Sequence, residues 1–346
     1  MYPKFFLFIF FCLIFENSSH AQQFKIVKIT KTIKNPWGMS LINEKKLILT
    51  SKRGGIFLVN LDKLKTKKIF QIQESFNFNQ GGLLDIIFIK NRNSDFIFVC
   101  YQDHSKDLVI VRYNLNNEKL FDKKLIFKSN YKNNNGRHFG CRLIEYKQTL
   151  LASLGDRGER KNSQNPKNYP GSIIQLTFDG IKVGKNRDSW LEGIFSIGHR
   201  NPQGLIYIKK IDQVWSHEHG PKGGDEINII KRGLNYGWPI VTYGKEYWGG
   251  KIGDGVPKNG MTEPVWTWTP SIAPSGMDYY NHDYFKNLKG FLLVGSLKFK
   301  SLYAVKISNQ KPISNTIIFK NKIGRIRDVL VHPDGYILLL NDEIQG

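Results

Sequence analysis

From Phe24 onward, the chain consists of short apolar runs that are separated by polar turns. The runs are rich in β-branched and aromatic residues and are bounded by Gly, Asn, Asp or Pro, which is typical of β-strands. Examples are residues 46–51, 55–61, 83–89, 95–101, 108–115, 149–155, 171–180, 205–208, 213–216, 264–270, 290–297, 301–307 and 336–342. Nowhere do apolar residues recur with the period of a long amphipathic helix. The pattern therefore predicts an all-β protein.

The number of runs and the chain length favour one particular all-β architecture. Turn dipeptides such as Asp179-Gly180 and Asp334-Gly335 recur between the runs, as they do in propellers and sandwiches. The roughly 320 residues that follow the N-terminal segment divide into about six blades of about 50 residues, each with about four strands. We expect a six-bladed β-propeller rather than a large β-sandwich.

Residues 1–21 have the pattern of a cleaved secretory signal. Lys4 supplies a positive start, residues 5–15 form an apolar run, and Ser19 and Ala21 are the small residues that a signal peptidase reads. The run is too short for a permanent membrane span, and no later stretch is apolar enough to be one. We expect a propeller domain over residues 22–346 that is exported to the periplasm and has no stable membrane anchor.

Composition adds an expectation about partners and one about cysteines. The formal net charge is +22, but the basic residues are scattered, without a long Lys/Arg block or a recognition helix, so we expect no nucleic-acid partner. Cys12 leaves with the signal. Cys100 and Cys141 either pair in an oxidising compartment or remain as two free, buried thiols. Their strand-like surroundings favour the free thiols.

Polar residues are concentrated in three turns between Ser196 and Pro239. Their sequences are GHRNPQGL at 198–205, EHGPKGGDEIN at 218–228 and GLNYGWP at 233–239. Backbone geometry explains the Gly and Pro of a turn, but not an Arg beside an Asn or a pair of acidic residues. Strands that end in such side chains form a scaffold for a site. The two histidines of His217-Glu218-His219 lack a third metal ligand, and we interpret them as structural.

These three turns resemble the signature of the soluble quinoprotein aldose (glucose) dehydrogenases. The resemblance extends over residues 25–343, nearly all of the chain that follows the signal. Members of this family are six-bladed β-propellers that use pyrroloquinoline quinone (PQQ) and calcium. The resemblance implies that this protein oxidises an aldose sugar at its anomeric carbon to a lactone. The electrons would leave to an external acceptor that the sequence does not identify.

The resemblance also assigns roles to single residues. It implies that His138, in the turn RHFG, is the general base, a role that suits an imidazole because its pKa is near neutrality. Arg200 would stabilise negative charge on the quinone carbonyl that receives hydride, with Asn201 beside it, and Gln80 would lie near the quinone. The family has a second Gly where this chain has Cys141, a larger side chain that is able to disturb the loop.

Two metal sites follow from the same resemblance. The catalytic calcium would be held by the backbone carbonyls of Gly220 and Pro221, because hard cations take oxygen ligands. A structural calcium would be held by Glu226 and Tyr236. From the residues alone, Asp225 and Glu226 are equally compatible with a solvated acidic turn.

A flat tricarboxylate such as PQQ needs several cations, and guanidinium groups match carboxylates best. The resemblance implies that Ser271, Lys298, Arg325 and Arg327 bind the cofactor. The two arginines are two positions apart, so on a strand they share a face. An ordinary surface position is the alternative for any single one of these cations, because the chain has 51 Lys and Arg residues.

The candidate residues are spread from position 80 to position 327. In a closed propeller, loops of successive blades converge on one mouth, so this spread is compatible with a single site. Two other functions stay open: a propeller that binds a ligand or partner without catalysis, and a calcium-dependent hydrolase of the lactonase type. The sequence stops soon after its last predicted strand, and we expect that a closing strand is either absent or truncated.

Overall fold

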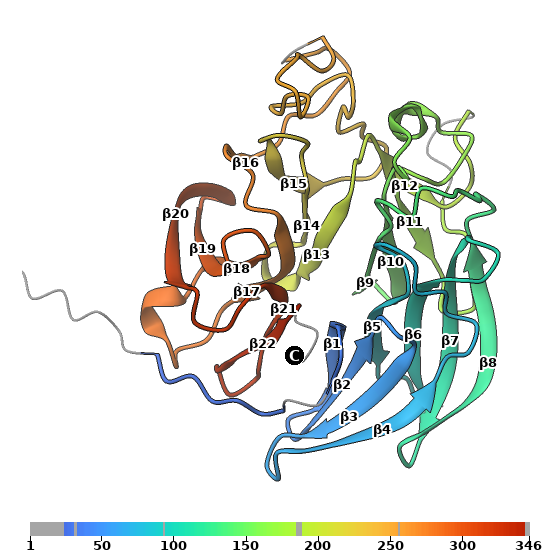
Figure 1. The fold of residues 1–346 in the computed structure, drawn as a ribbon, viewed down its shortest axis with the longest axis vertical. Coiled ribbons are helices and arrows are strands. Elements are labelled where there is room, and N and C mark those ends of the chain that lie inside the picture. The colour runs from blue at the N-terminus through green and yellow to red at the C-terminus, as the bar shows by residue number, and fades with distance from the viewer. Residues whose placement is uncertain (1–23, 31–32, 93, 185–188, 255–256, 343–346) are drawn as a thin grey trace, which may run out of the picture.

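The computed structural model describes residues 24–30, 33–92, 94–184, 189–254 and 257–342. Six antiparallel sheets surround a central axis as the blades of a propeller (Figure 1). Five of these sheets have 4 strands and the sixth has 2. The prediction of a six-bladed all-β propeller is confirmed. The predicted signal at 1–21 lies outside the described residues.

Each sheet is formed by strands that follow one another along the chain. The first two sheets contain β1 (Pro36–Asn43), β2 (Lys46–Ser51), β3 (Gly55–Asn60) and β4 (Lys65–Gln71), then β5 (Leu83–Ile89), β6 (Asp95–Gln102), β7 (Leu108–Asn116) and β8 (Lys119–Lys128). The third and fourth contain β9 (Gly140–Tyr146), β10 (Thr149–Leu154), β11 (Ser172–Leu176) and β12 (Ile194–Ile197), then β13 (Pro202–Ile208), β14 (Gln213–Glu218), β15 (Asp225–Ile230) and β16 (Trp266–Trp268). The last two contain β17 (Pro274–Tyr280), β18 (Phe291–Ser296), β19 (Ser301–Ser308) and β20 (Lys311–Lys320), then β21 (Ile326–Val331) and β22 (Ile337–Asn341). The helices of the described residues are short 3-10 turns: η1 (Arg160–Gln164), η2 (Lys209–Ile211) and η3 (Lys286–Leu288).

Burial differs between the strands of a sheet, and it explains why three outer strands have no apolar pattern. The inner strands β1, β5, β9, β13, β17 and β21 contact one another around the axis (Figure 1). The second strand of a sheet is covered on both faces, and seven of the eight residues of β6 are buried. The outer strands β4, β8 and β20 are rich in exposed Lys. These outer strands bury few side chains, so their sequences do not need to be apolar. For this reason the apolar runs did not include these three strands.

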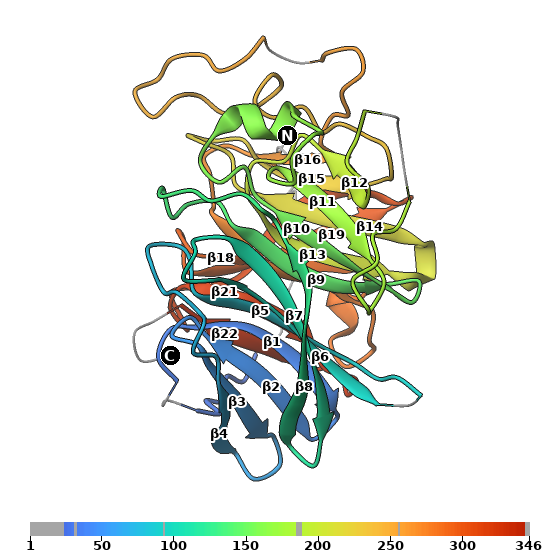
Figure 2. The same cartoon turned by 90° about the vertical axis from the view of Figure 1, so that its right-hand side faces the viewer.

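The ring closes between the last sheet and the first. The inner strand β21 lies between β17 and β1, and the backbone amide of Met39 donates a hydrogen bond of 3.0 Å to the Asp328 carboxylate. Leu338 and Leu340 of β22 pack with Met39 and Leu49 in one apolar cluster. In the side view, the inner strands of the first, second and sixth sheets lie close together (Figure 2). Within the described residues, two strands of the sixth sheet are therefore enough to join the fifth sheet to the first.

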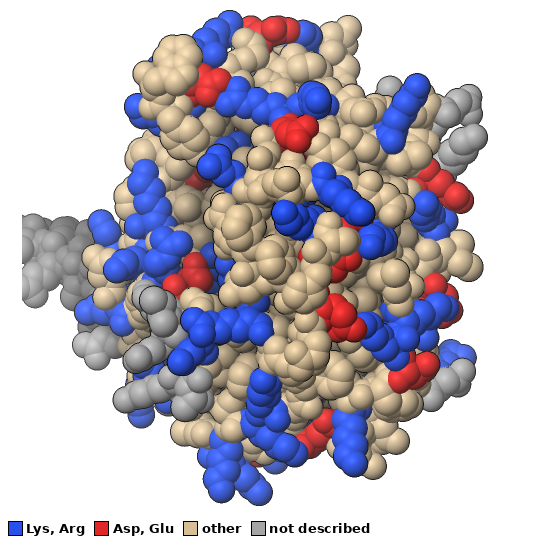
Figure 3. Space-filling view, turned by 45° about the vertical axis from the view of Figure 1, so that its right-hand side comes forward, with Lys and Arg blue, Asp and Glu red and all other residues tan. Residues whose placement is uncertain are grey.

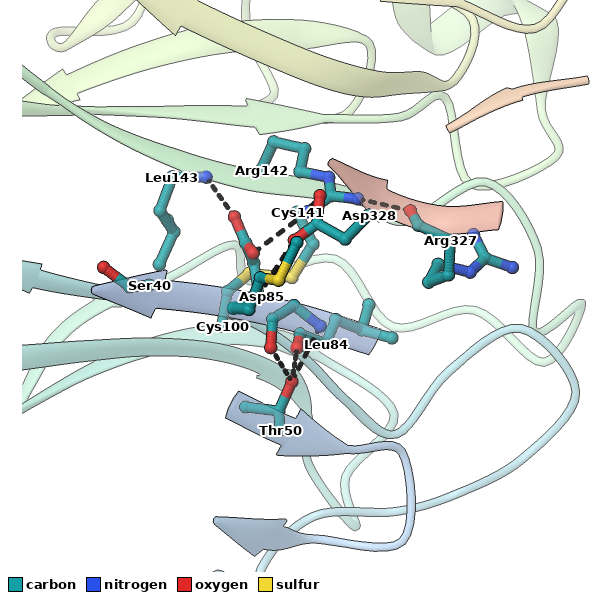
Figure 4. A network of polar contacts seen from close by, with 12 residues as sticks. Ser40, Thr50, Leu84, Asp85, Cys100, Cys141, Arg142, Leu143, Arg327 and Asp328 are labelled. Carbon is teal, nitrogen blue, oxygen red and sulfur yellow. Dashed lines mark hydrogen bonds and ion pairs between the residues drawn. A yellow bond between two sulfur atoms is a disulfide. The ribbon is translucent and has the colours of Figure 1, made fainter. Parts of the chain in front are cut away.

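A buried guanidinium group crosses the axis beneath the mouth (Figure 4). Arg142 of β9 forms ion pairs with Asp85 of β5 at 3.2 Å and with Asp328 of β21 at 2.9 Å. It also donates hydrogen bonds to the carbonyls of Gln203 and Arg327. Room for the two carboxylates exists because Gly38 and Gly276 face them, and a Cβ on either glycine would lie 2.4 Å from an aspartate oxygen. One side chain thus connects four of the six blades.

The expectation of free thiols at Cys100 and Cys141 is wrong. The two residues form a disulfide that joins β6 of the second sheet to β9 of the third, with Cα atoms 5.9 Å apart. Both residues are buried strand residues, as expected. They belong to consecutive blades, however, and it is the packing of β6 against β9 that brings them together. The disulfide fixes Cys141 to the neighbouring blade (Figure 4).

The outer surface is basic and mixed in sign. On the face shown in Figure 3, Lys and Arg side chains are spread over the whole outline, with Asp and Glu side chains between them. Many of the lysines on the outer strands have acidic partners, such as Lys123 with Glu74 and Lys124 with Asp179. Among the described residues, no helix is long and apolar enough to cross a membrane.

Candidate active site at the mouth of the ring

Most of the predicted site residues lie in connections of two kinds that share one end of the ring. Glu226 and Arg327 instead lie within β15 and β21, and Tyr236 lies in the connection from β15 to β16. The first kind leads from the outermost strand of one sheet to the inner strand of the next, and it carries Gln80, His138, Arg200, Ser271 and Arg325. The second kind joins the second and third strands of a sheet, and it carries Gly220, Pro221 and Lys298. Because the strands of each sheet are antiparallel, both kinds of connection emerge at the same end. That end is the mouth, and the scattered candidates converge there.

His138 is oriented by a carboxylate and an indole. Its Nδ1 lies 2.7 Å from Oδ1 of Asp156, and Oδ2 of Asp156 accepts a hydrogen bond of 2.9 Å from the Trp238 indole. Asp156 is 1% exposed, so its charge has no competing contact with bulk water. A carboxylate acceptor at Nδ1 keeps the proton on that nitrogen and leaves Nε2 as the free base.

The environment lowers the pKa of His138 below its ordinary value. Burial is the main cause, and the Arg200 guanidinium adds to it, whereas the hydrogen bond to Asp156 acts in the opposite direction. The imidazole is therefore neutral at neutral pH and can accept a proton. This is the protonation state that a general base needs.

The turn that carries His138 is held in an unusual backbone conformation. His138 and Cys141 have positive φ angles of 50° and 72°, a region that non-glycine residues rarely adopt. Two residues that were expected at the cofactor fix this turn: the Gln80 side chain accepts a hydrogen bond from the His138 amide at 2.8 Å, and the Asn201 side chain accepts one from the Gly140 amide at 3.2 Å. Gln80 and Asn201 therefore position His138.

Arg200 is fixed through its backbone and its guanidinium group. Glu218 accepts hydrogen bonds from the amides of Arg200 and Asn201 and pairs with His199. The Arg200 guanidinium donates to the His219 carbonyl at 3.1 Å and lies 5.2 Å from the centre of the Trp238 ring. The segment His217-Glu218-His219 thus has the structural role that was predicted, with Glu218 as a support for Arg200.

The cations expected at the cofactor lie with two further charged residues. Arg327 pairs with Asp342 at 2.7 Å, and Arg325 approaches the same carboxylate at 3.4 Å. Gln203 accepts a hydrogen bond from Arg327 at 3.3 Å. Lys52 lies close enough to this group to interact with its charges. Burial and the charge of Arg327 lower the pKa of Lys52. Lys298 is exposed at the rim.

The turn at Gly220 and Pro221 is connected to Ser271 by one carboxylate. Oδ1 of Asp225 accepts hydrogen bonds from the Gly220 amide at 2.9 Å and from the Ser271 hydroxyl at 2.8 Å. Its Oδ2 accepts bonds from the amides of Ile272 and Ala273. Asp225 is buried and holds two loops of the mouth together through these hydrogen bonds. It is therefore not part of a solvated turn.

Glu226 and Tyr236 are both buried, but their functional groups have different partners. The Tyr236 hydroxyl donates to the Ile229 carbonyl and accepts from the Lys231 amide, and its ring stacks on His199. Burial and the nearby charge of Glu218 raise the pKa of Glu226 well above its ordinary value, so a cation beside it would be favourable. The Tyr236 hydroxyl is already engaged by backbone groups of residues 229 and 231, so it is not free to hold a metal at Glu226.

Sequence reasoning missed several residues of the mouth. Asp156 lies in the turn GDRG, whose glycines mark a functional turn without showing which residue its carboxylate contacts. Lys52 and Asp342 lie beside ordinary strands and carry no local signal. Gln203 lies in the turn GHRNPQGL, but that turn does not show that Gln203 contacts Arg327. All four become visible only in the folded chain, because their partners are 15 or more positions away.

Known proteins are similar to this chain in sequence and in fold. A family model described as Glucose / Sorbosone dehydrogenase matches residues 33–346. Aldose sugar dehydrogenase YliI of Escherichia coli (strain K12) is 33% identical over 327 residues, which cover 90% of this chain and 88% of that protein.

Solved structures agree with this match. A crystal structure of a glucose dehydrogenase is similar at 30% identity and a TM-score of 0.86, covering 92% of this chain and 97% of the other. The PQQ-bound form of an aldose sugar dehydrogenase from Streptomyces coelicolor has the same fold, with 24% identity, a TM-score of 0.78 and coverage of 93% and 92%. The family match over residues 33–346 shows that this chain belongs to the glucose/sorbosone dehydrogenase family.

Proposed function

We propose that this protein is a periplasmic quinoprotein that oxidises aldose sugars at the anomeric carbon to lactones, with PQQ as hydride acceptor and Ca²⁺ as the assisting metal. The observation that carries the proposal is the His138–Asp156 pair at a mouth that also holds Arg200 and Arg327. Family membership and the relative named aldose sugar dehydrogenase support the same reaction.

The residues of the mouth fit a flat tricarboxylate. Nε of Arg200 and Nε of Arg327 are buried without a hydrogen-bond partner in the described part of the chain. Burial and the nearby charge of Arg327 lower the pKa of Lys52. A bound carboxylate would relieve both the unpaired donors and the repulsion between cations. Lys298, Arg325 and Arg327 would hold PQQ, with Lys52 as an additional cation.

The turn that contains Gly220 and Pro221 fits a hard cation. In the described part of the chain, no hydrogen bond is donated to the carbonyl oxygen of Gly220 or of Pro221. The turn is tight, because a Cβ on Gly220 would lie 2.3 Å from the Gly224 carbonyl. Ca²⁺ binds backbone carbonyls of this kind together with oxygen atoms from a ligand, so Gly220 and Pro221 would hold the metal.

Bound PQQ would supply a two-electron acceptor, and Ca²⁺ would supply a Lewis acid beside it. In the reaction, Nε2 of His138 takes the proton of the sugar's anomeric hydroxyl. Asp156 stabilises the imidazolium that forms and keeps the ring in place. Arg200 provides a positive charge that does not titrate, and it stabilises negative charge that develops at the mouth.

The setting of this reaction is part of the proposal. The signal pattern at 1–21 supports export to the periplasm. Each turnover leaves two electrons on the enzyme, so a separate external electron acceptor is required.

Reconstitution tests the proposal. The purified mature protein is mixed with Ca²⁺ and PQQ, and dye reduction is followed with a panel of aldoses. We expect quinone-dependent activity that is lost in His138→Ala and retained in His282→Ala, since His282 lies in the connection from β17 to β18 at the opposite end of the ring. Lactone hydrolysis that needs metal but no quinone would support the hydrolase instead. Binding of PQQ without oxidation of any sugar would support a propeller that only binds its ligand.

A further inference from the structure

The long connection from β15 to β16, residues 231–265, leaves its own end of the ring. β15 begins at the mouth and ends at Ile230 on the opposite side, so a short connection would remain on that side. Instead, residues 235–238 run along the end of β12 toward the mouth. The Tyr236 amide donates a hydrogen bond to the Ile197 carbonyl, and the Trp238 amide donates one to the Gly198 carbonyl. There the Trp238 indole donates a hydrogen bond to Asp156. The connection is the large loop at the top of Figures 1 and 2.

The next part of this connection is anchored to the mouth. Lys245 and Lys222 exchange two backbone hydrogen bonds of 3.1 Å, which place residue 245 beside the Gly220-Pro221 turn. Gly244 lies so close that a Cβ there would be 2.6 Å from the Pro221 ring. Glu246 then forms a bidentate pair with Arg160 of η1, at 2.6 and 2.8 Å. These contacts fix the loop on both sides of the boundary between the third and fourth blades.

The tip that follows is aromatic and open to solvent. Tyr247 and Trp248 are 70% and 82% exposed, the two highest values among the large hydrophobic residues of the described chain. The Trp248 ring lies on Gly250, where a Cβ would be 1.9 Å from the ring. One face of the indole is thus supported by backbone, and the other is free. Tyr247 and Trp248 follow one another, so two aromatic rings are presented to solvent at the same point of this anchored loop.

We propose that Tyr247 and Trp248 form an outer sugar subsite, which binds a second or third ring of an oligosaccharide whose reducing end enters the mouth. This inference rests on the proposed oxidation of aldoses. A sugar ring has an apolar C–H face that packs on an aromatic face, and hydroxyl groups that accept hydrogen bonds. The indole supplies the first kind of contact, and the exposed amines of Lys222 and Lys245 supply the second. The preferred substrate is then an oligosaccharide rather than a free monosaccharide.

The first experiment compares maltotriose and cellotriose with glucose in dye reduction by the reconstituted enzyme. In Trp248→Ala we expect kcat/KM for the favoured trisaccharide to fall about threefold to tenfold, as for the loss of one aromatic contact, with kcat/KM for glucose unchanged. Tyr284→Ala is the matched control, because Tyr284 is also exposed (63%) but lies at the opposite end of the ring. An equal loss for both sugars, or no loss for either, would overturn the subsite.

The second experiment separates this inference from the proposed function. The reduced alditols of the two trisaccharides keep the outer rings but have no anomeric carbon to oxidise. We expect the favoured alditol to change the tryptophan fluorescence of the protein in the absence of quinone, and Trp248→Ala to weaken this binding by a similar factor. If no sugar is oxidised but the alditol still binds through Trp248, the subsite stands and the proposed reaction fails. If neither alditol binds, the subsite is wrong even for an active dehydrogenase.

Discussion

The disulfide between Cys100 and Cys141 gives a prediction whose magnitude follows from the structure. It joins residues that are 41 positions apart, and closing a loop of that length removes about 4 kcal/mol of chain entropy from the unfolded state. We therefore expect Cys100→Ala/Cys141→Ala to lower the free energy of unfolding by about 4 kcal/mol. Cys141 has a φ of 72°, which costs a non-glycine residue roughly 1 kcal/mol. The variant Cys100→Ala/Cys141→Gly removes this strain and should lose only about 3 kcal/mol.

Denaturation with guanidinium chloride, followed by circular dichroism, measures both differences against the oxidised protein. The two variants differ only at position 141, so each is the control for the other. A thiol assay on the unfolded, unreduced mature protein should find no free thiol. A loss under about 1 kcal/mol in the Ala/Ala variant would refute the entropic argument, and two reactive thiols would refute the disulfide itself.

Three further predictions concern the mouth and the axis. Asp156→Asn should lower kcat by about 10²–10⁴-fold and leave PQQ binding unchanged, since the ring loses its orienting acceptor; a loss of both would indicate misfolding. The acid limb of kcat/KM should lie below pH 6.5, the ordinary pKa of histidine, because burial lowers the pKa of His138; a limb above that value in the pH profile of the reconstituted enzyme contradicts this role. Burial raises the pKa of Asp85 from 3.8 to about 7, so the folded chain keeps a proton that the unfolded chain releases. The stability from this proton is present below about pH 4 and is lost as the pH rises through about 7, and Asp85→Asn should flatten that fall in denaturation measured from pH 4 to 8.

The fold was largely predictable because most strands of a propeller are buried and therefore apolar. The run at 46–51 coincides with β2, and the run at 83–89 coincides with β5. The exposed strands β4, β8 and β20 could not be found in this way, because their Lys-rich sequences satisfy the backbone without burying apolar area. An apolar sequence pattern marks a buried strand, and these outer strands have few buried residues.

The candidate site was predictable only through its turns. His138, Arg200 and the Gly220-Pro221 turn stand in unusual sequences, and the structure brings them to one end of the ring. The partner of His138 was not predictable, since the contact with Asp156 spans two loops of the third blade. The cysteine pairing failed for the same reason, because β6 and β9 belong to different blades. Both contacts depend on how loops and neighbouring blades pack in the folded chain, and no local spacing encodes them.

The central claim is that the mouth is a PQQ site, and a binding titration tests it most directly. The mature protein is titrated with PQQ with and without Ca²⁺, and binding is followed by calorimetry. The account predicts one molecule bound per chain and tighter binding with Ca²⁺. Binding should be at least about tenfold weaker in Arg327→Ala. It should be unchanged in the control Lys147→Ala, because Lys147 is a surface residue that pairs with Asp212 at the end of the ring away from the mouth. A folded protein that binds no PQQ under either condition would contradict the account.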